Sequence, residues 1–265
     1  MRFWTGLAVT LTLYGASIDG AKISYTVSGT GSKTVLFVHG WTCDSSSWAR
    51  QVPAISRQYQ TVTIDLPGHG NSGSPGDGKF SMALFANTVE AVRREVHADK
   101  FVLVGHSMGT SVIRRYARLF PQHVAALVAV DGSVLTPPEN ADRVKLFQGP
   151  DAANARLELI RTMFTPATTP ELRARIEKMM MAPPDATAAR AMATLAEINS
   201  WKDDVISAPV LGIYAENSRR ANHEVLSHIF PSLVYTEIPG TGHFLMLEKP
   251  DAFNRILLDF LNKLK

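Results

Sequence analysis

Short apolar runs alternate with longer amphipathic stretches along most of the chain. Six runs are rich in β-branched residues and end in glycine or a polar residue: VLFVHG (35–40), TVTIDLPG (61–68), FVLVGHS (101–107), ALVAVDG (126–132), VLGIYA (210–215) and VYTEIPG (234–240). Continuous apolar runs are typical of strands buried on both faces, as in parallel sheets covered by helices. The alternation therefore predicts an α/β fold with a mostly parallel, doubly wound sheet.

Helical patterns fill the intervals between these runs. The expected helices cover residues 48–58, 81–97, 108–119, 219–229 and 250–264. The last of them begins with Pro250-Asp251, residue types that are preferred in a first helical turn. Near the N-terminus, residues 17–28 predict a hairpin that turns at Asp19-Gly20.

One interval, residues 133–206, interrupts the alternation. It has no strand signal but contains helical stretches, with starts marked at Thr169-Pro170-Glu171 and Pro184-Asp185. A loop of this length without secondary structure is uncommon in a compact domain. We therefore expect a helical cap inserted between two segments of one α/β core, residues 18–132 and 207–265.

The composition fits one large domain. A length of 265 residues with 45% hydrophobic residues suffices for a buried core. The net charge of +3 comes from scattered Lys and Arg, so nucleic acid is not an expected partner. The one cysteine, Cys43, excludes an intramolecular disulfide and a cysteine-based metal cluster, and we expect it to be a buried apolar filler.

Residues 1–17, MRFWTGLAVTLTLYGAS, allow two interpretations. Arg2 precedes an apolar stretch that is too short to span a membrane but suits a signal peptide cleaved after Ser17. The alternation of Val9, Leu11 and Leu13 suits a surface strand instead. The protein is expected to be secreted or periplasmic in the first case and cytoplasmic in the second, without an integral membrane span in either.

The segment VLVGHSMGTS, residues 102–111, carries the clearest chemical signal. Gly105, Ser107 and Gly109 form a G-x-S-x-G pattern between a predicted strand and a predicted helix. A serine on such a tight turn exposes its hydroxyl, and the two glycines remove side chains that would collide there. The helix N-terminus also favours developing negative charge. Ser107 is therefore the candidate nucleophile.

Four segments in this order resemble the α/β-hydrolase superfamily, and within it a serine esterase or lipase: VLFVHGW, IDLPGHGNS, VGHSMG and PGTGHFLMLEKP. The resemblance runs from about residue 20 to the C-terminus. It implies an oxyanion hole formed by the backbone N–H groups of Met108 and Trp41. Gly40, at the end of a predicted strand, lets the backbone turn toward that site. The Trp41 indole is expected either to line the acyl pocket or only to pack.

His243, in GTGHFLMLEKP, is the candidate base. A serine hydroxyl needs an adjacent base at neutral pH, and histidine titrates there. The loop after the last predicted strand can reach the carboxyl ends of the strands, where open α/β sheets carry their sites. We expect His39 and His69 to hold loops, and His106 to face away from Ser107 because neighbouring strand residues point to opposite sides.

A third group should orient the imidazole. In the superfamily it most often follows the strand predicted at 210–215, at the position that Ser218 occupies here, so the chain departs from the usual pattern. Asp131 and Glu216 both keep the order serine, acid, histidine. We favour Asp131, because a strand end beside the nucleophile's strand holds a side chain rigidly. Glu216 is the alternative acid, and a purely structural role for Asp131 as a helix cap stays open.

The predicted cap supplies apolar side chains, including the run Met179-Met180-Met181. Methionine adapts to irregular apolar ligands, and a lid over the serine would exclude water. We expect at least one of these methionines to be exposed or to line a cavity, and no arginine or lysine to point at the site. This combination favours an ester with a small or medium apolar acyl group.

The resulting hypothesis is a carboxylic-ester hydrolase that forms an acyl-enzyme on Ser107 and needs no metal and no organic cofactor. The same groups serve lactonases, thioesterases and carbon–carbon bond hydrolases. A non-catalytic ligand-binding protein on the same fold is the alternative from another class. The expected partner is a small-molecule ester, and the oligomeric state stays open.

Overall fold

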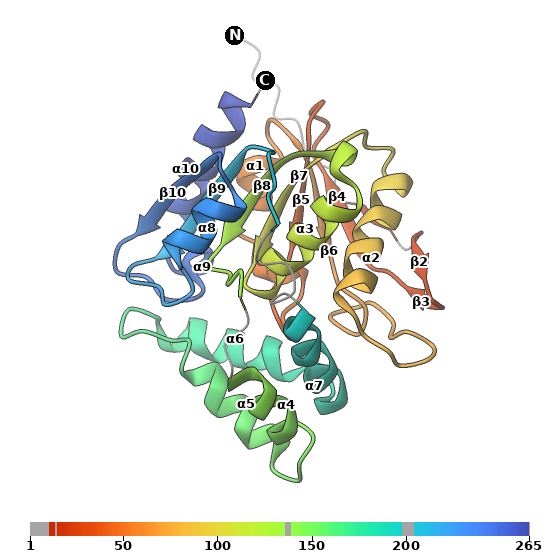
Figure 1. The fold of residues 1–265 in the computed structure, drawn as a ribbon, viewed down its shortest axis with the longest axis vertical. Coiled ribbons are helices and arrows are strands. Elements are labelled where there is room, and N and C mark those ends of the chain that lie inside the picture. Colours follow the sequence, from red (N-terminus) through yellow and green to blue (C-terminus); the bar gives the residue numbers. More distant parts are fainter. Residues whose placement is uncertain (1–10, 14, 136–138, 198–203, 265) are drawn as a thin grey trace.

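A central β-sheet dominates the computed structural model, which describes residues 11–13, 15–135, 139–197 and 204–264 (Figure 1). The sheet has eight strands in the order β1-β4-β6-β5-β7-β8-β9-β10, and β2 and β3 pair with each other in a separate ribbon. The strands are β1 (Leu11–Leu13), β2 (Ser17–Ile18), β3 (Ala21–Lys22), β4 (Tyr25–Ser28), β5 (Thr34–Val38), β6 (Gln60–Ile64), β7 (Phe101–His106), β8 (Val124–Val130), β9 (Val210–Ala215) and β10 (Leu233–Ile238).

Neighbouring strands from β6 to β10 run parallel, whereas β1 and β4 join the sheet in antiparallel pairs. The prediction of a mostly parallel sheet is confirmed. The hairpin at Asp19-Gly20 is also present, and both residues have the positive φ that a type I′ turn requires, 47° and 79°.

The N-terminal segment joins the edge of the sheet. Residues Leu11–Leu13 pair with Tyr25–Val27 of β4, so the strand interpretation is confirmed for these three residues. Residues 1–10, which hold most of the possible signal peptide, lie outside the described residues.

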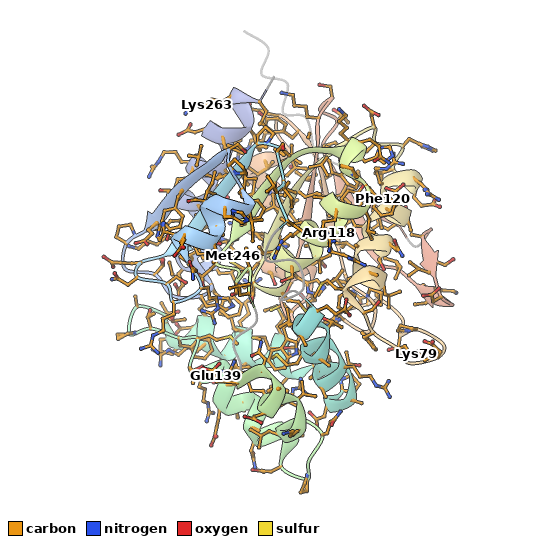
Figure 2. The ribbon with its side chains drawn as sticks, in the orientation of Figure 1. Lys79, Arg118, Phe120, Glu139, Met246 and Lys263 are labelled. Atoms are coloured by element: carbon orange, nitrogen blue, oxygen red, sulfur yellow. The ribbon has the colours of Figure 1, made fainter. Side chains whose placement is uncertain are left out.

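Helices cover the sheet, and every residue of β5 and β7 is buried. Helix α2 packs against α3, and α1 packs against α10. Apolar side chains fill the space between these layers (Figure 2). The helices of the core are η1 (Ser45–Trp48), α1 (Val52–Ile55), α2 (Met82–Glu95), α3 (Met108–Leu119), η2 (Pro121–His123), α8 (His223–Ile229), α9 (Leu245–Glu248) and α10 (Pro250–Lys263).

Two helices depart from the sequence-based prediction. The predicted helix over 48–58 is replaced by the short η1 and α1, because Pro53 has no N–H to donate within a helix and fits only at a helix start. Helix α8 begins at His223 rather than at residue 219, since the Asn222 side chain caps it by accepting the N–H of Val225 at 3.1 Å. Residues 219–222 therefore form a loop.

Further helices lie between β8 and β9 in the chain and are grouped beside one end of the sheet (Figure 1). The Thr169 side chain accepts the N–H of Leu172 at 3.3 Å and starts one of them, and another starts at Asp185, as the sequence predicts. Residues 136–138 and 198–203 lie outside the described residues. The described helices of this interval are α4 (Glu139–Leu146), α5 (Ala152–Arg161), α6 (Pro170–Met181) and α7 (Asp185–Thr194).

A buried carboxylate joins α2 to α3. Glu90 is 4% exposed, and it accepts hydrogen bonds from Arg93 at 2.8 Å, from Arg94 at 3.0 Å and from the hydroxyl of the fully buried Tyr116 at 2.9 Å. Burial alone would raise the pKa of Glu90, but these hydrogen bonds hold it at about 2. The carboxylate is therefore ionised at neutral pH and depends on its donors.

Replacement of Tyr116 by phenylalanine removes one donor from this buried carboxylate. We expect Tyr116→Phe to lower the free energy of unfolding by about 1–3 kcal/mol in urea denaturation at pH 7. Tyr235→Phe is the matched control, because its hydroxyl bonds to Glu237 at 2.8 Å in a half-buried position on β10. The control should change stability by less than about 0.5 kcal/mol, and equal losses would contradict the special role of the Glu90 cluster.

Candidate active site

Ser107 occupies a strained turn between β7 and α3. Its φ of 53° and ψ of −117° are unusual for a residue with a side chain. A Cβ on Gly105 would lie 2.3 Å from the carbonyl oxygen of Gly109, and a Cβ on Gly109 would lie 2.5 Å from the carbonyl oxygen of Val38. Both glycines are therefore required by close backbone approach. The Ser107 N–H donates to the carbonyl of Val130 at 2.9 Å, which ties the turn to β8.

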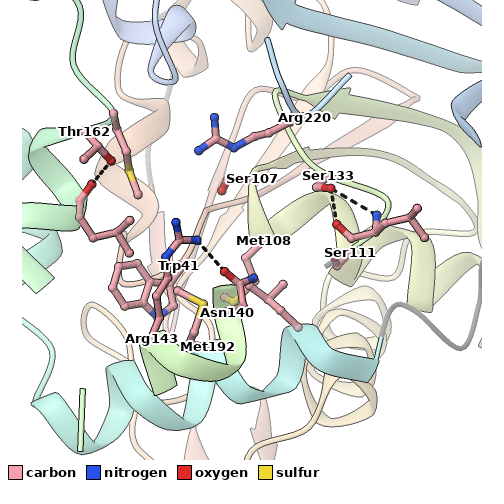
Figure 3. A pocket seen from close by; sticks show the side chains of 14 residues that line it. Trp41, Ser107, Met108, Ser111, Ser133, Asn140, Arg143, Thr162, Met192 and Arg220 are labelled. Atoms are coloured by element: carbon pink, nitrogen blue, oxygen red, sulfur yellow. Dashed lines mark hydrogen bonds between the residues drawn. The ribbon is translucent and has the colours of Figure 1, made fainter. Parts of the chain in front are cut away.

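Ser107 lines a cavity of about 150 Å³ whose walls come from the core and from the α4–α7 segment (Figure 3). The apolar part of the wall includes Met108, Leu159, Met163 and Met192. Met179, Met180 and Met181 are not among the residues that line this cavity; of the three, only Met181 is partly exposed. The sulfur of Met179, for example, accepts hydrogen bonds from hydroxyls on η1.

Trp41 both lines this cavity and packs against the helices above it. Its Nε1–H donates to the carbonyl of Ala188 in α7 at 2.8 Å, and its ring stacks on Phe147 at a centroid distance of 5.2 Å. The indole therefore lines the cavity as well as packing, and the alternative that it only packs is wrong. The backbone before it passes close to the serine, because a Cβ on Gly40 would lie 3.2 Å from the Ser107 Cβ.

The structure brings Asp131 and His243 together. The His243 Nδ1 lies 2.6 Å from the Asp131 Oδ2, and both side chains are buried. Asp131 follows β8, and its Oδ1 accepts the N–H of Ala215 at 3.2 Å. His106, expected to face away from Ser107, holds the loop that carries His243: its Nε2–H donates to the carbonyl of His243 at 2.8 Å. Sequence reasoning did not identify this positioning contact.

The alternative acid has a different partner. Glu216 is exposed, and its Oε2 accepts the N–H of Gly240 at 2.9 Å, which links the loops after β9 and β10. Ser218, at the position usual for the acid, makes a side-chain hydrogen bond to Asp131. The residue at the usual acid position, Ser218, therefore interacts with Asp131, the carboxylate that follows β8.

Two arginines line the cavity, so the expectation of no basic residue at the site is wrong. Arg143 comes from α4, and Arg220 comes from the loop before α8. The Arg220 Nη1 lies 3.4 Å from the Asp131 Oδ2. The physical reason for the error is local: because Asn222 delays the start of α8, Arg220 sits in a loop at the site instead of on an exposed helix.

Burial and neighbouring charges set the ionisation of this cluster. Burial lowers the pKa of His243, the charge of Arg220 lowers it further, and Asp131 raises it, with a net result below 6.5. Burial would raise the pKa of Asp131, but His243, Arg220 and Ser218 together hold it at about 2. A neutral imidazole beside an ionised carboxylate is suited to accept a proton at neutral pH.

Other polar groups near the loops are structural. The Nε2 of His39 accepts the N–H of Leu66 at 3.0 Å, and the Nδ1–H of His69 donates to the carbonyl of Pro67 at 2.9 Å. Cys43 is buried, and burial raises the pKa of its thiol. The described part of the chain contains no cluster of three or more His, Cys, Asp or Glu side chains that could hold a metal ion. It also contains no helix long and apolar enough to cross a membrane.

The fold and the turn at Ser107 define a class of protein. A family described as having the alpha/beta hydrolase fold matches residues 33–250, which is more than half of the chain. The chain therefore belongs to the α/β-hydrolase family.

Several relatives in this family are hydrolases by name. A Haemophilus influenzae protein named "Putative esterase/lipase" is 29% identical over 241 residues, 86% of this chain and 83% of its own length. The 2-hydroxy-6-oxononadienedioate/2-hydroxy-6-oxononatrienedioate hydrolase of Paraburkholderia phymatum is 26% identical over 264 residues, 91% of each chain. A solved structure titled "Est816 as an N-Acyl homoserine lactone degrading enzyme" is 27% identical, covers 92% of this chain and 99% of its own, and superposes with a TM-score of 0.82.

The charge of Arg220 should be measurable at His243. We expect the imidazole of His243 to titrate below pH 6.5 in the native protein, followed by side-chain NMR. Removal of the Arg220 cation removes its repulsion of the protonated imidazole, so Arg220→Gln should raise the pKa of His243. Arg219→Gln, an exposed neighbour with the same charge change, is the control. An unchanged His243 titration in Arg220→Gln would refute the electrostatic assignment.

Proposed function

We propose that this protein is a carboxylic-ester hydrolase in which Ser107 is the nucleophile, His243 the base and Asp131 the acid of a catalytic triad. The observation that carries the proposal is the 2.6 Å contact between the His243 Nδ1 and the Asp131 Oδ2, at the same end of the sheet as the strained Ser107 turn. With Nδ1–H donating to the carboxylate, Nε2 is the ring nitrogen that accepts the serine proton.

The proposed reaction follows from these positions. Ser107 Oγ attacks the ester carbonyl and transfers its proton to His243, and the imidazolium then protonates the leaving alcohol. Water, activated by the same histidine, hydrolyses the acyl-enzyme. Asp131 remains ionised throughout, since its pKa is about 2, and stabilises the imidazolium.

We place the oxyanion hole at the backbone N–H groups of Trp41 and Met108. Met108 is the first residue of α3, and the first N–H groups of a helix have no acceptor within the helix. Trp41 follows Gly40, whose backbone approaches Ser107 closely. Two donors so placed stabilise the tetrahedral intermediate, and loss of one costs about 2.7–4 kcal/mol in known cases.

We also propose that residues 133–206 form a cap over a core of residues 18–132 and 207–265. Side chains from α4, α5 and α7 line the same cavity as Ser107, and Trp41 is hydrogen-bonded to α7. Such a cap shields the site from bulk solvent. The small cavity supports a small or medium acyl part, with a hydrocarbon segment against the methionine and leucine walls.

Other substrates remain compatible with the same groups. Lactones, thioesters and carbon–carbon bonds next to a ketone are cleaved by related chemistry, and a lactone-degrading enzyme is among the similar structures. A ligand-binding protein that does not turn over substrate is the alternative from another class. The reactivity of the serine separates it from any hydrolase.

A fluorophosphonate probe tests the nucleophile directly. We expect one probe molecule per chain, located at Ser107 by peptide mass spectrometry, and no labelling of Ser107→Ala. The reason is that an activated hydroxyl attacks the phosphonate, whereas an ordinary serine does not. An unlabelled wild-type protein of native fold would reject the hydrolase and favour the ligand-binding alternative.

A pair of substitutions tests the acid. Asp131→Asn should lower kcat on p-nitrophenyl butyrate by about 10³-fold or more, because the amide no longer fixes the imidazole tautomer or stabilises its charge. Glu216→Gln should have little effect, since Glu216 is exposed and bonded to Gly240. Circular dichroism checks that both variants are folded. Similar small losses in the two variants would show that neither residue orients His243.

A further inference from the structure

We propose that the substrate carries a carboxylate as well as an ester, and that Arg143 and Arg220 bind this carboxylate in the cavity beside Ser107. The inference rests on the proposed function and names its substrate class. The two arginines come from distant parts of the chain, α4 and the loop before α8, and meet at one cavity (Figure 3).

The charge of the cavity wall is unbalanced. Among the described residues that line it, two are basic and none is acidic. The cavity is small, about 150 Å³, and much of its remaining wall is apolar. Both arginines are partly exposed, and two positive charges at one cavity focus a positive potential that would attract an anionic group of the ligand.

Among the described residues, the hydrogen-bond partner of the Arg143 guanidinium is an uncharged amide. The Arg143 Nη1–H donates to the Oδ1 of Asn140 at 2.7 Å, and Asn140 is only 7% exposed (Figure 3). An amide oxygen orients a guanidinium but carries no net charge. The contact lies within α4, so it fixes the direction of the guanidinium relative to this helix.

Among the described residues, the Arg220 guanidinium pairs with Asp131 through one long contact of 3.4 Å. That carboxylate already accepts His243 at 2.6 Å and the N–H of Ala215 at 3.2 Å. The guanidinium has five N–H donors in a planar fork, so one contact leaves donors for a ligand. Arg220 and Ser107 both line the cavity (Figure 3).

These positions define the ligand. Its ester carbonyl lies at Ser107, and its carboxylate lies within reach of Arg143 and Arg220. The apolar wall, with Trp41 and Met192, would contact a short hydrocarbon segment between the two groups. Planar carboxylates match the guanidinium fork, which makes them the anion of choice for paired arginines.

Two pairs of esters test the proposal. In the first pair the acyl side of the ester ends in a carboxylate (monomethyl adipate) or in a carboxamide (methyl adipamate). In the second pair the alcohol side ends in a carboxylate (6-acetoxyhexanoate) or in a carboxamide (6-acetoxyhexanamide). In at least one pair, we expect kcat/KM for the carboxylate to exceed that for the carboxamide by about tenfold or more. The pair that shows this preference identifies the side of the ester that carries the anion.

Variants assign the preference to residues. The ratio of kcat/KM for the carboxylate to kcat/KM for the carboxamide should fall several-fold in both Arg143→Gln and Arg220→Gln. Because both substrates are measured on the same variant, a general change in catalysis cancels in this ratio. Lys145→Gln on α4 and Arg219→Gln beside Arg220 remove exposed charges outside the cavity wall and should keep the wild-type ratio. A ratio that survives substitution of either cavity arginine overturns the proposed site.

The outcomes separate this inference from the proposed function. Two outcomes would reject the carboxylate substrate without rejecting the proposed hydrolase. One is a ratio near one in both pairs. The other is that none of the four esters is hydrolysed although fluorophosphonate labels Ser107. Absence of fluorophosphonate labelling rejects the hydrolase itself.

Discussion

The turn at Ser107 is in close contact with both neighbouring strands, and the arrangement of the site depends on this packing. On the β5 side, Gly109 lies against the carbonyl of Val38, and a Cβ at that position would come within 2.5 Å of it. On the β8 side, a Cβ at Gly132 would lie 2.0 Å from the Thr110 Oγ1. Any side chain at these glycines would push the strands apart, so the serine and the residues after β5 and β8 are fixed relative to one another.

This packing explains why Asp131 is well placed. It follows β8 directly, with a φ of 42°, and its N–H donates to the carbonyl of Ile213 in β9 at 3.0 Å. The Asp131 carboxylate is thus held at the end of β8, which pairs with the strand before Ser107, whereas Glu216 lies in an exposed loop. Ser218, at the usual acid position, bonds to Asp131 instead, so the loop after β9 still supports the His243 partner.

The order of the elements was predictable because it depends on local patterns. Strand β9 and helix α3 have the predicted bounds, since continuous apolar runs and the glycine-flanked serine mark them in the sequence. These bounds depend on information within a few residues of each position. Asp131 was the favoured partner of His243 for another reason: a strand end beside the strand that precedes Ser107 holds a side chain rigidly.

The parts that were missed depend on contacts between distant residues. Arg220 was assigned to a helix, and only the capping by Asn222 shows that it lies in a loop at the cavity. His106 was expected to face away from the nucleophile, but its use in holding the carbonyl of His243, 137 positions later, has no signal in the sequence. The choice of which methionines face the cavity likewise depends on how the α4–α7 helices pack.

The position of Arg220 would link the proposed carboxylate binding to the proposed base. The charge of Arg220 lowers the pKa of His243, so His243 would be a weaker base when the cavity holds no anion. A carboxylate bound to Arg220 would offset that charge and raise the proton affinity of His243 when an ester is next to Ser107. The same anion would leave Asp131 as the main charge acting on the imidazolium. A neutral ester of the same shape would gain neither effect, so discrimination against it would appear in kcat as well as in KM.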